Sequence, residues 1–261
     1  LGYRRDVADL EVLLPTGAAP LPAGDDERLS ALYAEPRLPW LRANMVATLD
    51  GAATGPDGRS GSINAPPDHR VFAVLRARAD VVLVGAGTVR VEGYRAPRTP
   101  GALVAGRRAR GQEDHPPLAV VTATGDLPEA MLVDEPRPFV VTTDRAPGLA
   151  RLRRLLPADR LLVHDGAVDL RAAVAAVARA GYPRVLTEGG PHLLRELVGA
   201  GLVDELCLTW SPLLVGGPAP RALAAGGWFS PPRRAHLAHL LHADGVLLGR
   251  WLLGDPEPLP A

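Results

Sequence analysis

The chain has 261 residues, 47% of them hydrophobic, so it is long enough to bury a substantial core. Its 29 basic and 29 acidic side chains cancel, which gives no electrostatic reason to expect a nucleic acid or a membrane surface as partner. All the basic residues are arginine, and the absence of lysine excludes a Schiff-base lysine, a pyridoxal phosphate enzyme and a P-loop.

The N-terminal part differs in character from the rest of the chain. Residues 1–39 contain several Pro and Gly and one predicted helix at 25–34, which indicates an arm packed on a main domain of residues 40–261. An apolar run at 41–47 predicts the first strand of that domain. The turn after it contains Asp50, which is either an ordinary Asp-Gly turn residue or a carboxylate available for chemistry.

A polar loop and a helix follow this strand. The loop spans residues 54–64 and contains Ser60 and Ser62. Pro66 then opens a helix, because proline suits a first helical turn, and Phe72 falls on its predicted buried side.

The first of two glycine sites comes next. Residues 80–84 form a short run rich in β-branched side chains, which predicts a buried strand. Gly85 and Gly87 follow it, and Thr88 begins a predicted short helix. Such a turn is either a plain tight turn or a phosphate cradle, since unpaired N–H groups at a helix start favour an anion. It is not the full dinucleotide fingerprint, because Arg90 occupies the place of the third glycine.

Further along, strands and helices alternate. Residues 94–117 are rich in Arg, Gly and Pro and predict a long loop, either a working loop or disorder. After it, an alanine-rich helix is expected at 169–180. Strand-like runs lie on both sides of this helix, at 118–122, 139–143, 161–164 and 185–187. This alternation predicts an α/β fold with a mostly parallel central sheet flanked by helices.

The second glycine site repeats the pattern of the first. Gly189 and Gly190 follow a predicted strand, and Pro191 opens a helix that continues through residues 192–198. Two such helix starts at the carboxyl ends of parallel strands suit a ligand with two phosphates, or a cofactor beside a phosphorylated substrate.

The C-terminal part predicts antiparallel strands. After a run at 203–210, two runs at 235–241 and 246–253 are joined by Asp244-Gly245, a hairpin signal. Three histidines at intervals of three, His236, His239 and His242, lie in the first of these runs and directly after it. Side chains alternate faces along a strand, so we interpret them as surface histidines and expect no metal site.

Four ordered sequence blocks resemble the riboflavin-biosynthesis pyrimidine reductase family. The resemblance runs from about Trp40 to the C-terminus and is carried by NMVATLDG at 44–51, LRARAD at 75–80 with VGAGTV at 84–89, TEGG at 187–190 and GLVDEL at 201–206. It implies a dihydrofolate-reductase-like α/β fold and an NADPH-dependent reductase. The implied reaction opens the ribose of a ribosylamino-pyrimidine phosphate by hydride delivery to C1′, and it needs no metal because the nicotinamide carries the hydride.

The resemblance also implies functional residues. The cofactor would contact Val46, Ser62, Gly85, Ala86, Gly87, Thr88, Glu92, Gly189, Gly190, Pro191, His192, Leu193, Leu194 and Glu196. The substrate would contact Ser60, Arg76, Arg95, Arg98 and Glu188. Asp50 and Glu188 are the candidate catalytic proton sources, with an ordinary salt bridge as the alternative role for Glu188.

The sequence departs from the family pattern in two places. The family has an Asp followed by a Pro-containing, Leu-Thr-x-Arg phosphate-binding run, whereas this chain reads EGYRAPR from Glu92 to Arg98, which leaves the phosphate-binding arginine open. Bifunctional members also carry a deaminase half with a zinc site of two or three cysteines. Because Cys207 is the only cysteine, we expect a stand-alone reductase.

Two other functions stay open from the sequence. One is an NADPH-dependent reductase of a pteridine such as dihydrofolate, and the other is a nucleotide-binding module without turnover. If NADP is preferred, an arginine is expected near the adenosine ribose, and Arg145 is the candidate. No apolar run reaches the length of a membrane span, so we expect a cytoplasmic protein, and the apolar C-terminal strands indicate a homodimer.

Overall fold

The computed structural model describes residues 8–254. The predicted arm and domain, 1–39 and 40–261, therefore each have a terminal stretch outside the described residues. The helices are α1 (Asp26–Leu32), α2 (Pro66–Arg78), α3 (Ala86–Glu92), α4 (Gly101–Ala109), α5 (Glu129–Val133), α6 (Leu149–Leu155), α7 (Leu170–Arg179) and α8 (Pro191–Gly199), with 3-10 turns η1 (Ser60–Ser62) and η2 (Ala158–Arg160). The strands are β1 (Glu11–Leu14), β2 (Trp40–Thr48), β3 (Val81–Gly85), β4 (Leu118–Val121), β5 (Phe139–Thr143), β6 (Leu161–His164), β7 (Arg184–Thr187), β8 (Glu205–Ser211), β9 (Ala235–Ala243) and β10 (Val246–Leu253).

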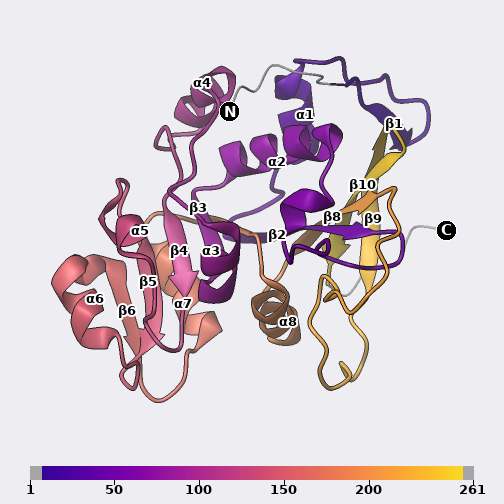
Figure 1. The fold of residues 1–261 in the computed structure, drawn as a ribbon. Helices are drawn as coiled ribbons and strands as arrows, with labels where there is room; N and C mark the ends of the chain where they lie inside the picture. The colour runs from indigo at the N-terminus through magenta and orange to yellow at the C-terminus, as the bar shows by residue number, and fades with distance from the viewer. Residues whose placement is uncertain (1–7, 255–261) are drawn as a thin grey trace.

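All ten strands form one sheet in the order β1-β9-β10-β8-β2-β7-β3-β4-β5-β6 (Figure 1). Pairing is parallel from β8 through β2, β7, β3, β4 and β5 to β6. It is antiparallel among β8, β10, β9 and β1. The predicted mostly parallel α/β fold with an antiparallel C-terminal hairpin is therefore confirmed.

Apolar cores lie on both faces of the sheet. Along β3, Val82 and Val84 face a core shared with α1, α2, α5 and α6, whereas Val81 and Leu83 face a core shared with α7 and α8. A strand covered on both faces carries a continuous apolar run, which explains the sequence of β3. This covering leaves the carboxyl ends of the parallel strands as the edge where the connecting turns meet.

The described part of the N-terminal arm is built into the fold. Strand β1 pairs with β9, and α1 packs against α2. Glu35, after α1, forms ion pairs with Arg42, Arg78 and Arg184, at N–O distances of 3.2, 2.5 and 3.7 Å. The arm thus supplies one strand of the sheet and a buried carboxylate among three arginines.

Residues 94–117, predicted to be a working loop or disorder, contain the helix α4. The helix is held by Arg107, which is 1% exposed and donates to the carbonyls of Ala77 and Ala79 at the end of α2, at 3.2 and 2.6 Å. Burial lowers the pKa of Arg107 to about 10. The sequence analysis did not predict this helix, because α4 has no wide apolar stripe and depends on arginine-to-carbonyl bonds.

His239 also differs from its prediction. Strand β9 places it in the interior, 3% exposed, with its ring 4.6 Å from that of Tyr33 in an edge-to-face contact. Its Nε2 has no hydrogen-bond partner among the described residues. Burial and the nearby Arg250 guanidinium lower the pKa of His239 to about 4.

His239 should make the fold sensitive to acid. Its pKa is lower in the folded chain than in the unfolded one, so the unfolded chain binds the proton first as pH falls below about 6.5. The free energy of unfolding should therefore fall between pH 6.5 and 4, by up to about 3 kcal/mol from this group. Urea unfolding of the native chain and of His239→Gln across this range measures the difference.

The matched control is His242→Gln, on the same strand, where the ring is partly exposed and bonded to Glu11. It should keep the pH dependence that His239→Gln loses. Parallel pH profiles for the native chain and His239→Gln would contradict the assignment.

Candidate active site

The two glycine sites meet at the carboxyl ends of adjacent parallel strands, β3 and β7. The Gly85 N–H donates to the Gly189 carbonyl at 2.8 Å. A Cβ at Gly85 would lie 3.8 Å from the Gly190 nitrogen, and one at Gly190 only 2.6 Å from Thr88 Oγ1. Bare backbone from both turns thus forms one continuous wall.

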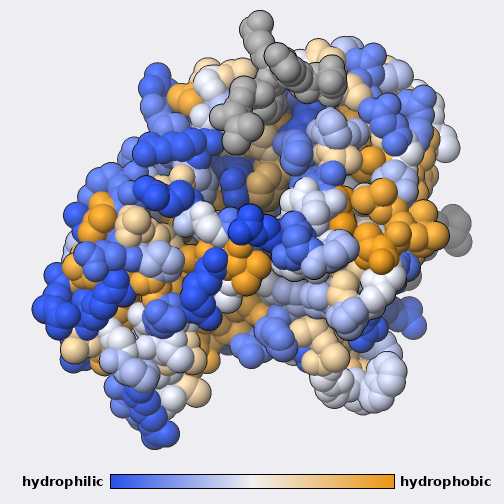
Figure 2. Space-filling model, viewed as in Figure 1, coloured by the Kyte–Doolittle hydropathy of each residue, from blue (hydrophilic) through white to orange (hydrophobic). Residues whose placement is uncertain are grey.

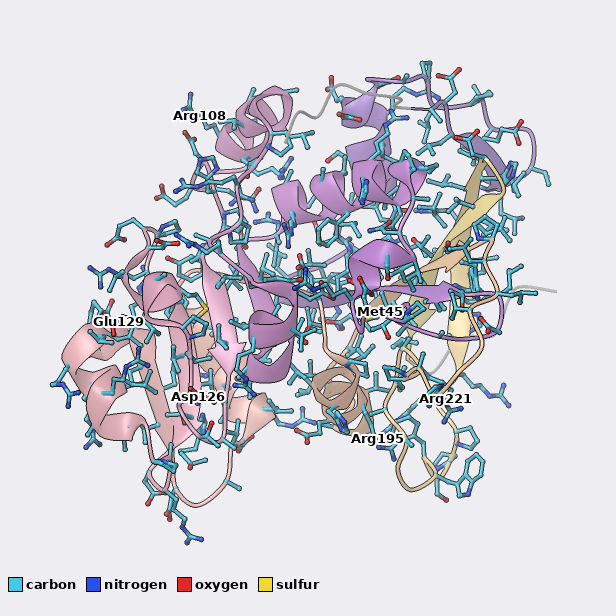
Figure 3. The ribbon with its side chains drawn as sticks, viewed as in Figure 1. Met45, Arg108, Asp126, Glu129, Arg195 and Arg221 are labelled. Carbon is cyan, nitrogen blue, oxygen red and sulfur yellow. The ribbon has the colours of Figure 1, made fainter. Side chains whose placement is uncertain are left out.

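A cavity of about 710 Å³ opens beside this wall. Its sides come from β2, α2, the turn into α3, the segment after α3, and the start of α8. Met45 on β2 lines it, and Figure 3 shows this residue between α2 above and α8 below. The predicted site residues that line the cavity are Val46, Ser60, Arg76, Gly85, Gly87, Thr88, Glu92, Arg95, Arg98, Glu188, Gly190, Pro191, His192 and Leu193.

Five predicted cofactor residues do not line the cavity. Ala86 and Leu194 are buried in the cores, and a Cβ at Gly189 would lie 3.1 Å from the Met45 sulfur. Ser62 donates to Asp57 Oδ1 at 2.7 Å, and Glu196 is exposed on α8. None of these five residues is part of the cavity lining.

Asp50, a predicted catalytic residue, also lies outside the cavity lining. Its carboxylate accepts hydrogen bonds from the Thr48 hydroxyl and from the backbone N–H groups of Val215 and Gly216, the latter two at 3.2 and 2.7 Å. The Thr48 bond and then the Gly216 bond lower the pKa of Asp50. Asp50 thus joins two loops at a turn outside the cavity lining, and its catalytic role stays a prediction.

Glu188 is held by two neighbours at the cavity. Arg76 forms a bidentate ion pair with it: Nε donates to Oε1 and Nη2 donates to Oε2, both at 2.7 Å. The Tyr94 hydroxyl also donates to Oε2. Glu188 is 3% exposed and Arg76 25%. Burial and the Glu188 charge raise the pKa of Tyr94 well above its usual value, so Tyr94 keeps its proton. The sequence analysis did not predict this role for Tyr94.

Two predicted binding residues are bonded to each other. Glu92 Oε1 accepts from the backbone N–H and the hydroxyl of Ser60, at 2.8 and 2.9 Å. Because Glu92 ends α3 and Ser60 begins η1, this contact fixes the polar loop against the glycine wall. Glu92, longer than the family's Asp, is thereby a structural link at the cavity.

The rim arginines are exposed and already paired. Arg95 forms an ion pair with Asp134 at 2.8 Å, and an Arg98 Nη2 lies 3.4 Å from the Glu135 carbonyl. Arg145, the expected adenosine-phosphate contact, lies beside Gly166 and does not line the cavity.

The lining includes residues that the sequence analysis did not assign to a site. Asp68 and Phe72 precede Arg76 on α2 by two turns and one turn, and all three line the cavity. Asp68 is 2% exposed and accepts from the Thr209 hydroxyl, and burial raises its pKa. Asp68 and Phe72 lie eight and four residues before Arg76, on the same face of the helix, and this spacing was the signal that could have identified them.

Among residues 8–254, no group of three or more His, Cys, Asp or Glu side chains is placed to hold a metal ion. Within the same range, no helix is both long and apolar enough to cross a membrane.

A ligand cavity at the carboxyl ends of parallel strands, walled by glycine backbone and containing an acid and an arginine, defines the α/β enzymes that bind a nucleotide-type cofactor. The chain belongs to the RibD C-terminal domain family, whose pattern matches residues 39–248. The resemblance to riboflavin-biosynthesis pyrimidine reductases is thus confirmed, and the chain is an oxidoreductase.

The chain is similar to one reductase in sequence and to two solved structures in fold. The 2,5-diamino-6-ribosylamino-4(3H)-pyrimidinone 5′-phosphate reductase of Archaeoglobus fulgidus is 30% identical over 182 residues, covering 69% of this chain and 83% of that protein. A pyrimidine reductase-like protein of Corynebacterium diphtheriae has a TM-score of 0.71 at 23% identity, covering 84% and 93%. A deaminase/5-amino-6-(5-phosphoribosylamino)uracil reductase of Thermotoga maritima has a TM-score of 0.60 at 16% identity, covering 89% and 63%.

The Arg76–Glu188 pair should be strongly coupled. Glu188→Gln leaves the Arg76 cation without its carboxylate in a largely buried place, and should lower the free energy of unfolding by about 3 kcal/mol. Tyr94→Phe removes one hydroxyl donor and should cost about 1 to 2 kcal/mol. Urea unfolding at neutral pH measures both.

The control is a double-variant cycle. Arg76→Met combined with Glu188→Met should be clearly less destabilised than the sum of the two single variants, because each single change leaves an unpaired charge. Additive effects would show that the pair is not coupled.

Proposed function

We propose that this chain is an NADPH-dependent reductase of a ribosylamino-pyrimidine 5′-phosphate. In the proposed step, the C1′–O4′ bond of the ribose opens, C1′ receives a hydride and O4′ receives a proton, which gives a ribityl chain. The observation that carries the proposal is the cavity beside the paired glycine turns in a chain of the RibD C-terminal domain family.

The residues at the glycine wall fit a nicotinamide dinucleotide. Gly85 and Gly190 present backbone without a Cβ, and the N–H groups that follow Pro191 in the first turn of α8 suit a phosphate. Val46 and Leu193 add apolar lining for a flat ring. When bound, the dihydronicotinamide supplies the hydride, and the protein positions and orients it.

The substrate side is formed by α2 and the segment after α3. Arg76 and Glu188 hold each other in place at the cavity, while Arg95 and Arg98 lie at its rim and are the candidates for a phosphate contact. Of the two predicted proton sources, Glu188 lines the cavity and Asp50 does not. We therefore assign the proton transfer to the side of the cavity where Glu188 lies.

We also propose that two copies associate through the antiparallel end of the sheet. Leu214 and Trp228, in the connection between β8 and β9, are 76% and 96% exposed. On the face drawn in Figure 2, apolar residues gather on the side where β9 and β10 lie. Arg221 lies in the same connection, below the strands in Figure 3.

Substrate turnover separates the candidate functions. Purified protein should oxidise NADPH in the presence of a ribosylamino-pyrimidine phosphate and not in the presence of dihydrofolate, followed by the absorbance of the reduced nicotinamide. Oxidation with dihydrofolate alone would support the pteridine reductase instead. Tight NADPH binding without oxidation by either substrate would support a nucleotide-binding module, and NADH in place of NADPH tests the cofactor preference.

Gly190→Ala should weaken NADPH binding. The added Cβ would come within 2.6 Å of Thr88 Oγ1, so the Thr88 hydroxyl or the turn must move. We expect the Kd for NADPH to rise at least about tenfold, measured by calorimetry.

The control for this change is Gly101→Ala, at the first position of α4, where nothing lies within 4 Å of the new Cβ. Its affinity for NADPH should equal that of the native chain. Unchanged affinity in Gly190→Ala would show that this turn is not part of the cofactor site.

A further inference from the structure

Asp68 is a buried carboxylate that the proposed reaction does not use. It is 2% exposed and lines the cavity from the first turn of α2. It takes part in none of the ion pairs found among residues 8–254. Its hydrogen-bond partners are the Thr209 hydroxyl and the Asn64 side chain. A buried carboxylate without a cation is costly, so its remaining lone pairs favour a ligand that brings N–H donors.

Helix capping does not account for Asp68. Pro66 and Pro67 occupy the first two helical positions and have no N–H to offer, and the Ala65 N–H already donates to Asn64 Oδ1 at 2.7 Å. The bond from Thr209 anchors Asp68 to β8 through Oδ1. A carboxylate can accept about four hydrogen bonds, so capacity remains on the cavity side.

Helix α2 places three side chains in a fixed order along its side of the cavity. Asp68, Phe72 and Arg76 follow one face of α2 at intervals of four residues, so the acid and the arginine are about 12 Å apart along the axis with the aromatic ring between them. A flat heterocycle lying beside Phe72 would therefore direct one edge to Asp68. The rest of the ligand would extend towards Arg76 and the rim.

We propose that Asp68 binds the N3–H and 2-amino edge of a 2-aminopyrimidin-4-one, and so selects a substrate ring with an amino group at C2 over a uracil. Two parallel donors match the two oxygens of a carboxylate, whereas the C2 carbonyl of uracil would point a lone pair at it. The inference rests on the proposed function and narrows its substrate. Both ring types occur in the names of the similar proteins, the diaminopyrimidinone in Archaeoglobus fulgidus and the aminouracil in Thermotoga maritima.

Binding of two bases that differ only at C2 tests the proposal without turnover. Calorimetry in the presence of NADPH compares 2,5,6-triaminopyrimidin-4(3H)-one with 5,6-diaminouracil. The native chain should bind the triamino compound at least about tenfold more tightly, because the uracil loses a charged hydrogen bond and gains a repulsive contact. Asp68→Asn should bring the ratio close to one, since an amide can donate to the carbonyl.

Matched variants separate recognition from folding. Asp126→Asn, on an exposed loop away from the cavity, should keep the native ratio (Figure 3). Thr209→Val removes the hydroxyl but keeps the carboxylate, so it should retain a preference for the triamino compound even if Asp68→Asn does not fold. Because burial raises the pKa of Asp68, the preference of the native chain should weaken as pH falls, earlier than for an ordinary aspartate.

Three results would overturn the proposal: equal binding of the two bases by the native chain, an unchanged ratio in folded Asp68→Asn, or no binding of either base by protein that binds NADPH. Equal turnover of the diaminopyrimidinone and aminouracil phosphates would refute the role of Asp68 and leave the reductase function standing. A ring preference that depends on Asp68, without NADPH oxidation, would support the role of Asp68 and refute the reductase function.

Discussion

The hydrogen bond from the Gly85 N–H to the Gly189 carbonyl is the contact on which the cavity depends. The ladder between β3 and β7 ends at Leu83 and Thr187. Beyond these residues the two strands would separate, since one leads into α3 and the other into α8. This bond carries the pairing past the end of the ladder, so the two turns stay in contact. Glu188 lies between the ladder and the bond, which fixes its side chain at the cavity. The same few residues therefore position the bare backbone wall and the acid that Arg76 binds.

Helix α2 forms the opposite wall and sets the polarity of the cavity. At one end Arg76 is neutralised by Glu188, and Tyr94 keeps its proton because burial and the Glu188 charge raise its pKa. At the other end Asp68 has hydroxyl and amide partners but no cation. The carboxylates at the two ends, Glu188 and Asp68, are both buried, so water screens neither strongly. A ligand spanning the wall would thus meet a neutralised pair at one end and an acceptor at the other.

The sequence predicts the elements well and the side-chain roles only in part. Apolar runs located β3 and β7, and the glycines after them predicted two turns at one edge of the sheet, which β3–β7 pairing confirms. The sequence analysis did not assign Asp68 and Tyr94 to the site, because their roles depend on how α2 and the segment after α3 turn towards the sheet. In the sequence alone, Asp50 fits both an ordinary Asp-Gly turn and a site carboxylate. Helix α4 and buried His239 show the same limit. The bonds from Arg107 to backbone carbonyls and the packing of the His239 ring on Tyr33 produce no periodic pattern in the sequence.

The N-terminal arm has a consequence for where this protein can be divided. Similarity to the family begins at residue 39, yet Leu10, Leu21, Leu29 and Tyr33 belong to the core on the α2 face of the sheet. A boundary drawn at the start of the similarity would uncover that core and leave Arg42 and Arg78 without the carboxylate of Glu35. The segment that matches the family pattern is therefore smaller than the unit that folds. Residues 8–38 are a structural part of this reductase, as much as the motifs by which the family is found.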